Sequence, residues 1–163
     1  MAPTPEAWQW APGVAPRTGP TVCVDIDGVL ADGRHRQHLV NRHPKDWPAF
    51  FRAAADDAVL DTQAHLLDQF AEGLVIALGT SRPEWVRSLT TRWLFEHDIR
   101  WDLLAMRPDD DRRPAPSVKS AIVDALRTAE LEPVFALDDD PRNVLAYAEA
   151  GVPCLYVHSG YHS

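Results

Sequence analysis

The chain has 163 residues, 45% of them hydrophobic and 25% charged, which gives room for roughly one ordinary domain. Its 24 acidic and 16 basic residues leave a formal net charge of -8. This charge argues against a protein that coats nucleic acid or an anionic membrane by bulk electrostatics, because such proteins carry basic surfaces. It is compatible with a local site that grips a single phosphate.

No stretch approaches the roughly 18 apolar residues of a membrane span, and the first residues lack the features of a signal peptide. We therefore expect a cytoplasmic protein without a membrane partner. Cys23 and Cys154 each lie in an apolar, β-branched run typical of a buried strand. Two reduced core thiols are the favoured interpretation over a disulfide.

Residues 1–20 are rich in proline and show no hydrophobic period, so they are predicted to be a tail outside the domain of residues 21–163. Trp8 and Trp10 leave the state of this tail open. It could dock on the domain, be disordered or be bound by a partner, because two large apolar rings on a free tail would be wasteful.

The remaining chain alternates between short apolar runs and helical patterns. Residues 21–26 form a continuous β-prone run, typical of a strand buried on both faces of a parallel sheet. Similar runs lie at 74–78, 101–106, 134–137 and 152–157, and helical patterns lie at 62–71, 83–96, 116–129 and 141–150. This order predicts right-handed βαβ units and a doubly wound α/β fold, with a parallel sheet covered by helices on both faces.

Residues 31–61 do not fit this rhythm and are predicted to form a small cap insertion with one short helix. The histidines in this stretch lack companion ligands at zinc spacing, so they are interpreted as surface or lid residues. Trp47 and Phe50 form the aromatic pair most able to stack on a base, although packing within the cap is the favoured alternative. Trp85 and Trp93 are expected in the core, on the helix that follows Pro83.

Polar side chains follow three of the predicted strands, at the edge where doubly wound folds bind ligands. They are Asp25, Asp27, Thr80, Ser81, Arg82, Asp138 and Asp139. Each alone could be a turn or helix cap. Four carboxylates at one edge would repel one another unless a cation neutralised them, and oxygen-only ligands suit Mg²⁺. The set therefore predicts a site for Mg²⁺ and phosphate.

The run from Asp25 to Leu30, followed in order by Thr80, Lys119 and Asp138–Asp139, resembles the haloacid dehalogenase superfamily of aspartyl-phosphate phosphatases. Further stretches are similar to the 3'-phosphatase domain of bacteriophage-type polynucleotide kinase/phosphatases. They lie at residues 80–84, 93–94, 106–113, 118–119 and 137–144. One departure is Asp140, which stands where that domain commonly has an arginine and which we expect to cap the helix at Pro141.

The resemblance implies four catalytic residues. Asp25 would be the nucleophile that forms an aspartyl-phosphate, and Asp27 would be the general acid and then the general base. Alternation along an extended strand would point both carboxylates to one face. Thr80 would donate a hydrogen bond to the phosphate, and Lys119 would neutralise it in the transition state.

The resemblance also implies a Mg²⁺ site. Asp25, Asp27 and Asp138 would be its ligands, and Asp139 would support them by holding a metal-bound water or Lys119.

The insertion is too short for a full cap domain, so the site is expected to be open enough for the end of a polymer. Arg34, Arg82 and Arg113 are expected to bind substrate phosphates, because arginine binds phosphate bidentately. Ser81 is expected to join them, with a helix-capping role as its alternative. Arg36 is interpreted as an ordinary solvated residue.

These interpretations predict a Mg²⁺-dependent phosphomonoesterase that removes 3'-phosphate from DNA or RNA ends in nucleic acid end repair. The chain has no P-loop, so a separate kinase or ligase partner would have to complete the repair. One alternative is a phosphatase for small nucleotides or metabolites. A more remote alternative is a non-catalytic phosphate-binding module, which would have no need for Asp27.

Overall fold

The computed structural model describes residues 4–162. Six strands form one sheet, in the order β1 (Trp8–Trp10), β6 (Leu103–Arg107), β5 (Val75–Pro83), β2 (Gly19–Val24), β7 (Leu131–Asp138) and β8 (Cys154–Tyr156). All neighbouring pairs are parallel except β1 with β6. The predicted doubly wound α/β sheet is confirmed.

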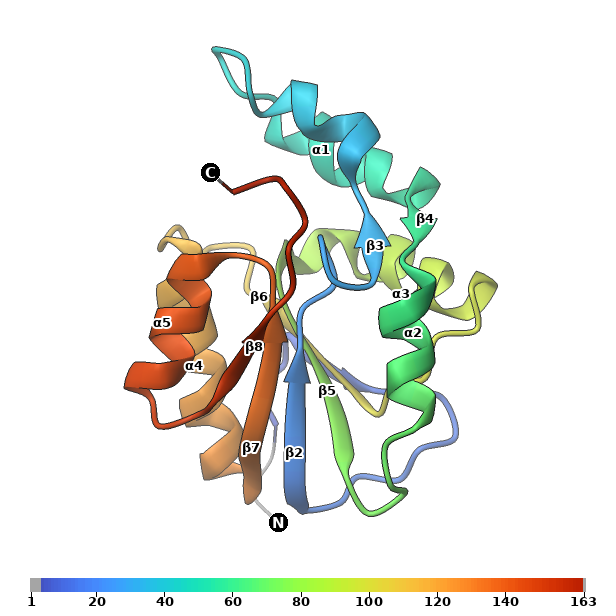
Figure 1. Ribbon diagram of the computed structural model, residues 1–163, viewed down its shortest axis with the longest axis vertical. Helices are drawn as coiled ribbons and strands as arrows, with labels where there is room; N and C mark the ends of the chain where they lie inside the picture. Colours follow the sequence, from blue (N-terminus) through green and yellow to red (C-terminus); the bar gives the residue numbers. More distant parts are fainter. Residues whose placement is uncertain (1–3, 163) are drawn as a thin grey trace.

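Helices pack on both faces of the sheet (Figure 1). They are α2 (Asp61–Asp68), α3 (Arg87–Glu96), α4 (Ala115–Thr128) and α5 (Pro141–Glu149). Along β2, Val22 and Val24 belong to the core beneath α2 and α3, whereas Cys23 belongs to the core beneath α4 and α5. A strand with helices on both sides needs apolar residues at every position, which explains the continuous run in the sequence.

The insertion after β2 lies above the carboxyl ends of the strands (Figure 1). It consists of the 3₁₀ turns η1 (Arg34–Leu39) and η2 (Ala53–Asp56), the helix α1 (Trp47–Arg52), and the two-stranded ribbon of β3 (Ala31–Asp32) and β4 (Ala58–Val59). The sequence predicted one short helix here and missed the ribbon, whose strands are each two residues long.

The predicted strands and helices lie within a few residues of their expected positions, with one informative exception. β5 continues as far as Pro83, so Thr80, Ser81 and Arg82 are strand residues. A 3₁₀ turn, η3 (Glu84–Val86), then precedes α3. Trp85 in this turn is 45% exposed, so the expectation that it lies in the core is wrong, whereas Trp93 is buried as expected.

The two cysteines behave as expected for separate thiols. β7 lies between β2 and β8, and both Cys23 and Cys154 are free. Burial raises the pKa of the Cys23 thiol to about 12, which keeps it protonated and unreactive.

The prediction that residues 1–20 form a tail outside the domain is wrong for residues 8–10 and 19–20, which are strands of the sheet. Trp8–Trp10 pairs antiparallel with β6, and Gly19 already belongs to β2. Trp8 is buried in the same core cluster as Leu103 and Ala105. This strand was not predicted because it is three residues long and lies among prolines. Three residues are too few to show a hydrophobic period.

Within the described residues, every helix is too short or too polar to span a lipid bilayer.

We expect Trp8→Ala to lower the free energy of unfolding by about 3 kcal/mol, because it removes a buried aromatic ring and leaves a cavity at the sheet edge. Phe95→Ala is the matched control, since Phe95 is 84% exposed on α3 and its loss should cost less than about 0.5 kcal/mol. Urea denaturation measures both values. Equal stability of the two variants would show that the N-terminal strand contributes nothing to the core.

Candidate active site

Three buried carboxylates meet at the carboxyl edge of the sheet. Asp25 follows β2, Asp138 ends β7, and Asp139 comes next in the chain. One oxygen from each lies within 4.8 Å of the others. The strand ends therefore bring these residues together as the sequence predicted, and their spacing suits a single cation.

Lys119 of α4 lies fully buried beside this carboxylate cluster. Its Nζ is 3.0 Å from Asp25 Oδ1 and 3.2 Å from Asp138 Oδ2, and it donates a 2.5 Å hydrogen bond to the carbonyl of Gly79. Burial disfavours the ammonium, but the two carboxylates outweigh that effect and raise the pKa of Lys119 well above its usual value. Lys119 thus shares one positive charge between two carboxylates, and Asp138 Oδ2 accepts no hydrogen bond within the described residues.

Asp25 has a raised pKa, first because it is buried and then because the negative charges of Asp138 and Asp139 lie nearby, although Lys119 acts in the opposite direction. The uncompensated negative charge is the electrostatic feature that a bound cation would relieve.

Asp139 is held by the C-terminal strap, residues 157–162, which runs from β8 up to the cap (Figure 1). Ser159 Oγ donates a 2.6 Å hydrogen bond to Asp139 Oδ2, and His162 Nε2 lies 3.4 Å from the same oxygen. Of the two predicted partners of Asp139, a metal-bound water or Lys119, the described contacts do not include Lys119, which contacts Asp25, Asp138 and Gly79. The strap was not predicted from the sequence, because its polar residues follow no motif.

Gly28 makes room for this arrangement. Its φ is +80°, and a Cβ at this position would lie 2.0 Å from Asp139 Oδ2 and 3.1 Å from the Cβ of Ser159. A side chain here would be strained and would also displace the carboxylate.

Asp27 was also predicted to be a metal ligand. Among the described residues, its carboxylate lies outside the group formed by Asp25, Asp138 and Asp139. β2 ends at Val24, and the chain then turns, with the amides of Leu30 and Ala31 bonded to the carbonyl of Ile26. The alternation expected of an extended strand therefore does not apply to Asp27.

Two arginines hold the Asp27 carboxylate. Arg82 donates to both of its oxygens, at 3.0 Å from Nε and 2.7 Å from Nη2, and Arg36 Nη2 donates to Oδ1. Partial burial raises the pKa of Asp27, but the guanidinium groups of Arg82 and Arg36 outweigh it and lower the pKa well below its usual range. Asp25 and Asp27, two positions apart, therefore have pKa values displaced in opposite directions.

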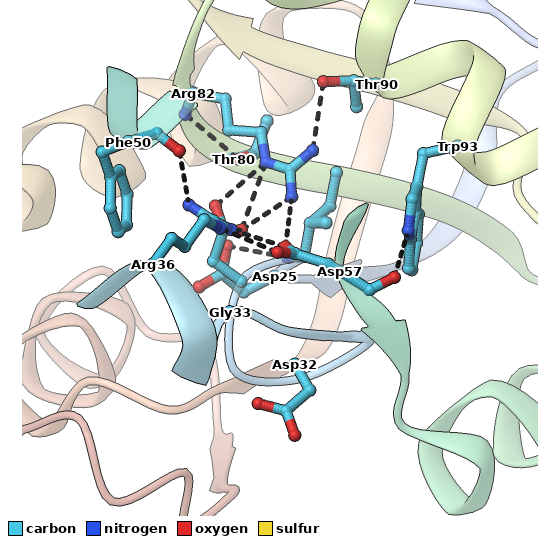
Figure 2. Close-up of polar contacts among 12 residues, drawn as sticks. Asp25, Asp32, Gly33, Arg36, Phe50, Asp57, Thr80, Arg82, Thr90 and Trp93 are labelled. Atoms are coloured by element: carbon cyan, nitrogen blue, oxygen red, sulfur yellow. Dashed lines mark hydrogen bonds and ion pairs between the residues drawn. The ribbon is translucent and has the colours of Figure 1, made fainter. Parts of the chain in front are cut away.

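Arg36 is fully buried, so its interpretation as a solvated residue is wrong. Its guanidinium donates to both oxygens of the buried Asp57, at 2.8 and 2.6 Å, and lies over the ring of Phe50 at 4.2 Å (Figure 2). Asp57 also accepts from His35, and Arg82 Nη2 lies 3.5 Å from it. The partners of Arg36 are 9 and 21 positions away, so no local pattern could have identified the pair.

The expected phosphate-binding residues fall into two groups. Thr80 and Arg82 are buried at the end of β5, beside the site, and the Thr80 hydroxyl accepts a hydrogen bond from the Arg82 amide. Ser81 Oγ is buried and has no partner within the described residues.

Arg34 and Arg113 form the second group. Both have exposed side chains, paired with Asp32 and Asp111. No described contact brings either arginine to the carboxylate cluster.

A family model described as "Polynucleotide kinase PNKP phosphatase domain" matches residues 19–162. The chain belongs to this family. It is thus a phosphatase domain of the haloacid dehalogenase superfamily, and the family named from the sequence is confirmed.

Solved structures agree with this assignment. A chain from "Structure of the Pnkp1/Rnl/Hen1 RNA repair complex" is similar with a TM-score of 0.70 and 26% identity, over 92% of this chain and 45% of that one. A haloacid dehalogenase-like hydrolase, SP0104 from Streptococcus pneumoniae, shares the fold at a TM-score of 0.57 and 14% identity, over 83% of each chain. This chain spans about half the length of the repair-complex chains. A comparison with curated proteins finds no match.

In this PNKP-type phosphatase domain, two charged clusters lie side by side at the carboxyl edge of the sheet. Asp25 and Lys119 belong to the carboxylate cluster beneath the end of β2. Asp27 belongs to a network with Arg36, Asp57 and Arg82, which joins the cap to β5. The arrangement separates a carboxylate whose neighbours suit a cation from one whose neighbours are already cations.

We expect Asp57→Ala to lower the free energy of unfolding by about 3–5 kcal/mol, because it leaves the buried guanidinium of Arg36 without its main partner. Glu132→Ala is the control. It removes an exposed ion pair with Arg127 and should cost no more than about 1 kcal/mol. Urea denaturation measures both. A small effect of Asp57→Ala would show that the network does not fix the cap.

Proposed function

We propose that this domain hydrolyses phosphomonoesters in a Mg²⁺-dependent, two-step reaction through an aspartyl-phosphate on Asp25. We further propose that its substrate is the 3'-phosphate of a DNA or RNA end. The observation that carries the proposal is the placement of Asp25 in a carboxylate cluster beside Lys119, with Asp27 held separately by two arginines.

The residues present fit Mg²⁺. Asp25, Asp138 and Asp139 offer only oxygen ligands within 4.8 Å of one another. The buried Asp138 Oδ2 accepts no hydrogen bond within the described residues, and its close cation is Lys119 at 3.2 Å. Bound there, Mg²⁺ would screen the repulsion between the phosphate dianion and the attacking carboxylate. We leave the Asp27 carboxylate out of this proposed ligand set, because its oxygens face Arg36 and Arg82.

In the first step, a carboxylate oxygen of Asp25 attacks phosphorus, and the bond from phosphorus to the leaving oxygen breaks. Lys119 stabilises the charge on the phosphoryl oxygens. The Thr80 hydroxyl accepts from the Arg82 amide, so its own proton is free to be donated to the phosphate. Asp27 protonates the leaving alkoxide.

The arginines around Asp27 bear on both of its roles. Phosphate oxygens entering the site would compete for Arg82 and weaken its hold on Asp27, so that this carboxylate can take up a proton from solvent water. Asp27 then transfers that proton to the leaving alkoxide. In the second step, ionised Asp27 accepts a proton from water, and the water oxygen attacks the aspartyl-phosphate. Inorganic phosphate leaves, and the Asp25 carboxylate is regenerated.

The polynucleotide substrate is supported by the family match and by the likeness to a chain of an RNA repair complex. That complex also contains Rnl and Hen1, which supports a separate kinase or ligase partner in a repair pathway. A phosphatase for small nucleotides or metabolites is the second candidate. It is favoured by Arg34 and Arg113, which pair with Asp32 and Asp111 and so are not free for backbone phosphates.

We expect the domain, with Mg²⁺, to release phosphate faster from a 3'-phosphorylated oligonucleotide than from free 3'- or 5'-nucleotides. Removing Mg²⁺ with a chelator should stop the release. Asp25→Asn should reduce it at least about a thousandfold, because the amide is a poor nucleophile. Cooperative thermal unfolding of the variant checks that it is folded. Phosphate assays on this panel measure each result. Equal or faster turnover of mononucleotides would defeat the polymer substrate, and an active Asp25→Asn would defeat the nucleophile assignment.

We expect Ser159→Ala to weaken Mg²⁺ binding about tenfold, because residues that orient a metal ligand typically contribute this much to affinity. The rise of the thermal midpoint with Mg²⁺ concentration reports the affinity without relying on activity. Ser120→Ala is the control, since the Ser120 hydroxyl donates to the carbonyl of Pro116 within its own helix α4. The same Mg²⁺ response in both variants would remove Ser159 from the metal site.

A further inference from the structure

Aromatic side chains connect the cap helix α1 to the turn η3 that follows β5. Trp47 stacks on Phe51 with ring centroids 5.8 Å apart, and Phe51 meets Trp85 edge to face at 6.4 Å. Trp47 is 46% exposed and Trp85 is 45% exposed. We call these three residues the aromatic shelf. A cluster formed only to pack the cap would bury its largest rings, and this one leaves them open to solvent.

The shelf lies one layer of side chains from the catalytic edge. Phe50 contacts Trp47 and Phe51, at 5.6 and 5.4 Å between ring centroids, and its ring lies 4.2 Å from the guanidinium of Arg36. Arg36 in turn holds the Asp27 carboxylate. The chain between η3 and the site is equally short, because Trp85 follows Arg82 by three positions.

Two exposed cations lie over the shelf. The guanidinium of Arg52 is 5.2 Å from the ring of Trp85, and Lys45 Nζ is 5.6 Å from the ring of Trp47. Neither cation forms an ion pair with a carboxylate of residues 4–162. In a chain of net charge -8, two cations on exposed indoles give local complementarity to a ligand that combines phosphates with flat rings.

We propose that Trp47 and Trp85 stack on unpaired bases of the strand that leads its 3' end to Asp25, with Lys45 and Arg52 contacting the phosphates between them. Stacking needs an open base face, which a paired and stacked duplex does not offer, so the shelf selects single-stranded or frayed ends. This inference rests on the proposed function, which brings a 3' end to Asp25.

The test measures binding of a fluorescently labelled, single-stranded, 3'-phosphorylated oligonucleotide by anisotropy, in an Asp25→Asn background that does not hydrolyse it. We expect Trp47→Ala and Trp85→Ala each to raise the Kd about tenfold, and the Phe variants to restore most of the affinity. Phe95→Ala is the control, since Phe95 is an exposed aromatic on α3 that makes no ring contact with the shelf among the described residues.

A second oligonucleotide, with abasic sites in place of its last bases, separates stacking from folding. It should bind more weakly to the background protein and show no further loss with the alanine variants. Unchanged affinity of both variants for the normal oligonucleotide would overturn the proposal, as would an equal loss for the abasic one. A further outcome is that the enzyme with native Asp25 releases no 3'-phosphate while binding still depends on the bases and the indoles. That result would overturn the proposed function and would support base stacking on the aromatic shelf.

Discussion

Mutual repulsion of buried carboxylates is the constraint on which the rest of this molecule depends. Asp25, Asp27 and Asp57 come from three separate positions at one sheet edge and its cap. Ionised carboxylates at short distances from one another are tolerated only when cations lie between them. Lys119 reaches the first from α4, and Arg36 lies between the other two. The long connection after β2 is thus more than a cover, because it delivers a cation that the Asp27 carboxylate needs.

The same distribution of cations gives two nearby carboxylates different chemistry. Asp25 shares one ammonium with Asp138, and burial raises its pKa, whereas Asp27 receives two guanidinium groups, and its pKa falls. Pairs of carboxylates with opposite shifts are how enzymes assign distinct roles to the same functional group. The division fits a nucleophile that works beside a cation and an acid–base group that exchanges protons away from it.

The sequence was sufficient where the determinant is local. Apolar runs followed by polar residues predicted that Asp25, Thr80 and Asp138 would gather at one edge, because parallel strands align their carboxyl ends. It was insufficient where partners are distant. The hydrogen bond between Arg36 and Asp57 spans 21 positions, and that between Ser159 and Asp139 spans 20. Residue pairs this far apart in the sequence form no recognisable motif. The N-terminal strand was missed for another reason, since its stability comes from the neighbouring β6 rather than from its own period.

The cap and the C-terminal strap also explain why the net charge of the chain is a poor guide to the charge around the site. Tyr161 of the strap donates a 2.7 Å hydrogen bond to Asp32 at the base of the cap, and Ser159 of the same strap holds Asp139. Acidic residues around the site therefore accept hydrogen bonds that hold the strap in place, and these donors partly offset their negative charge. The cations Lys45 and Arg52 are instead exposed on the aromatic shelf. The electrostatic potential that a phosphate meets at this edge depends on which charged side chains are exposed there. The net charge of the whole chain does not give that local potential.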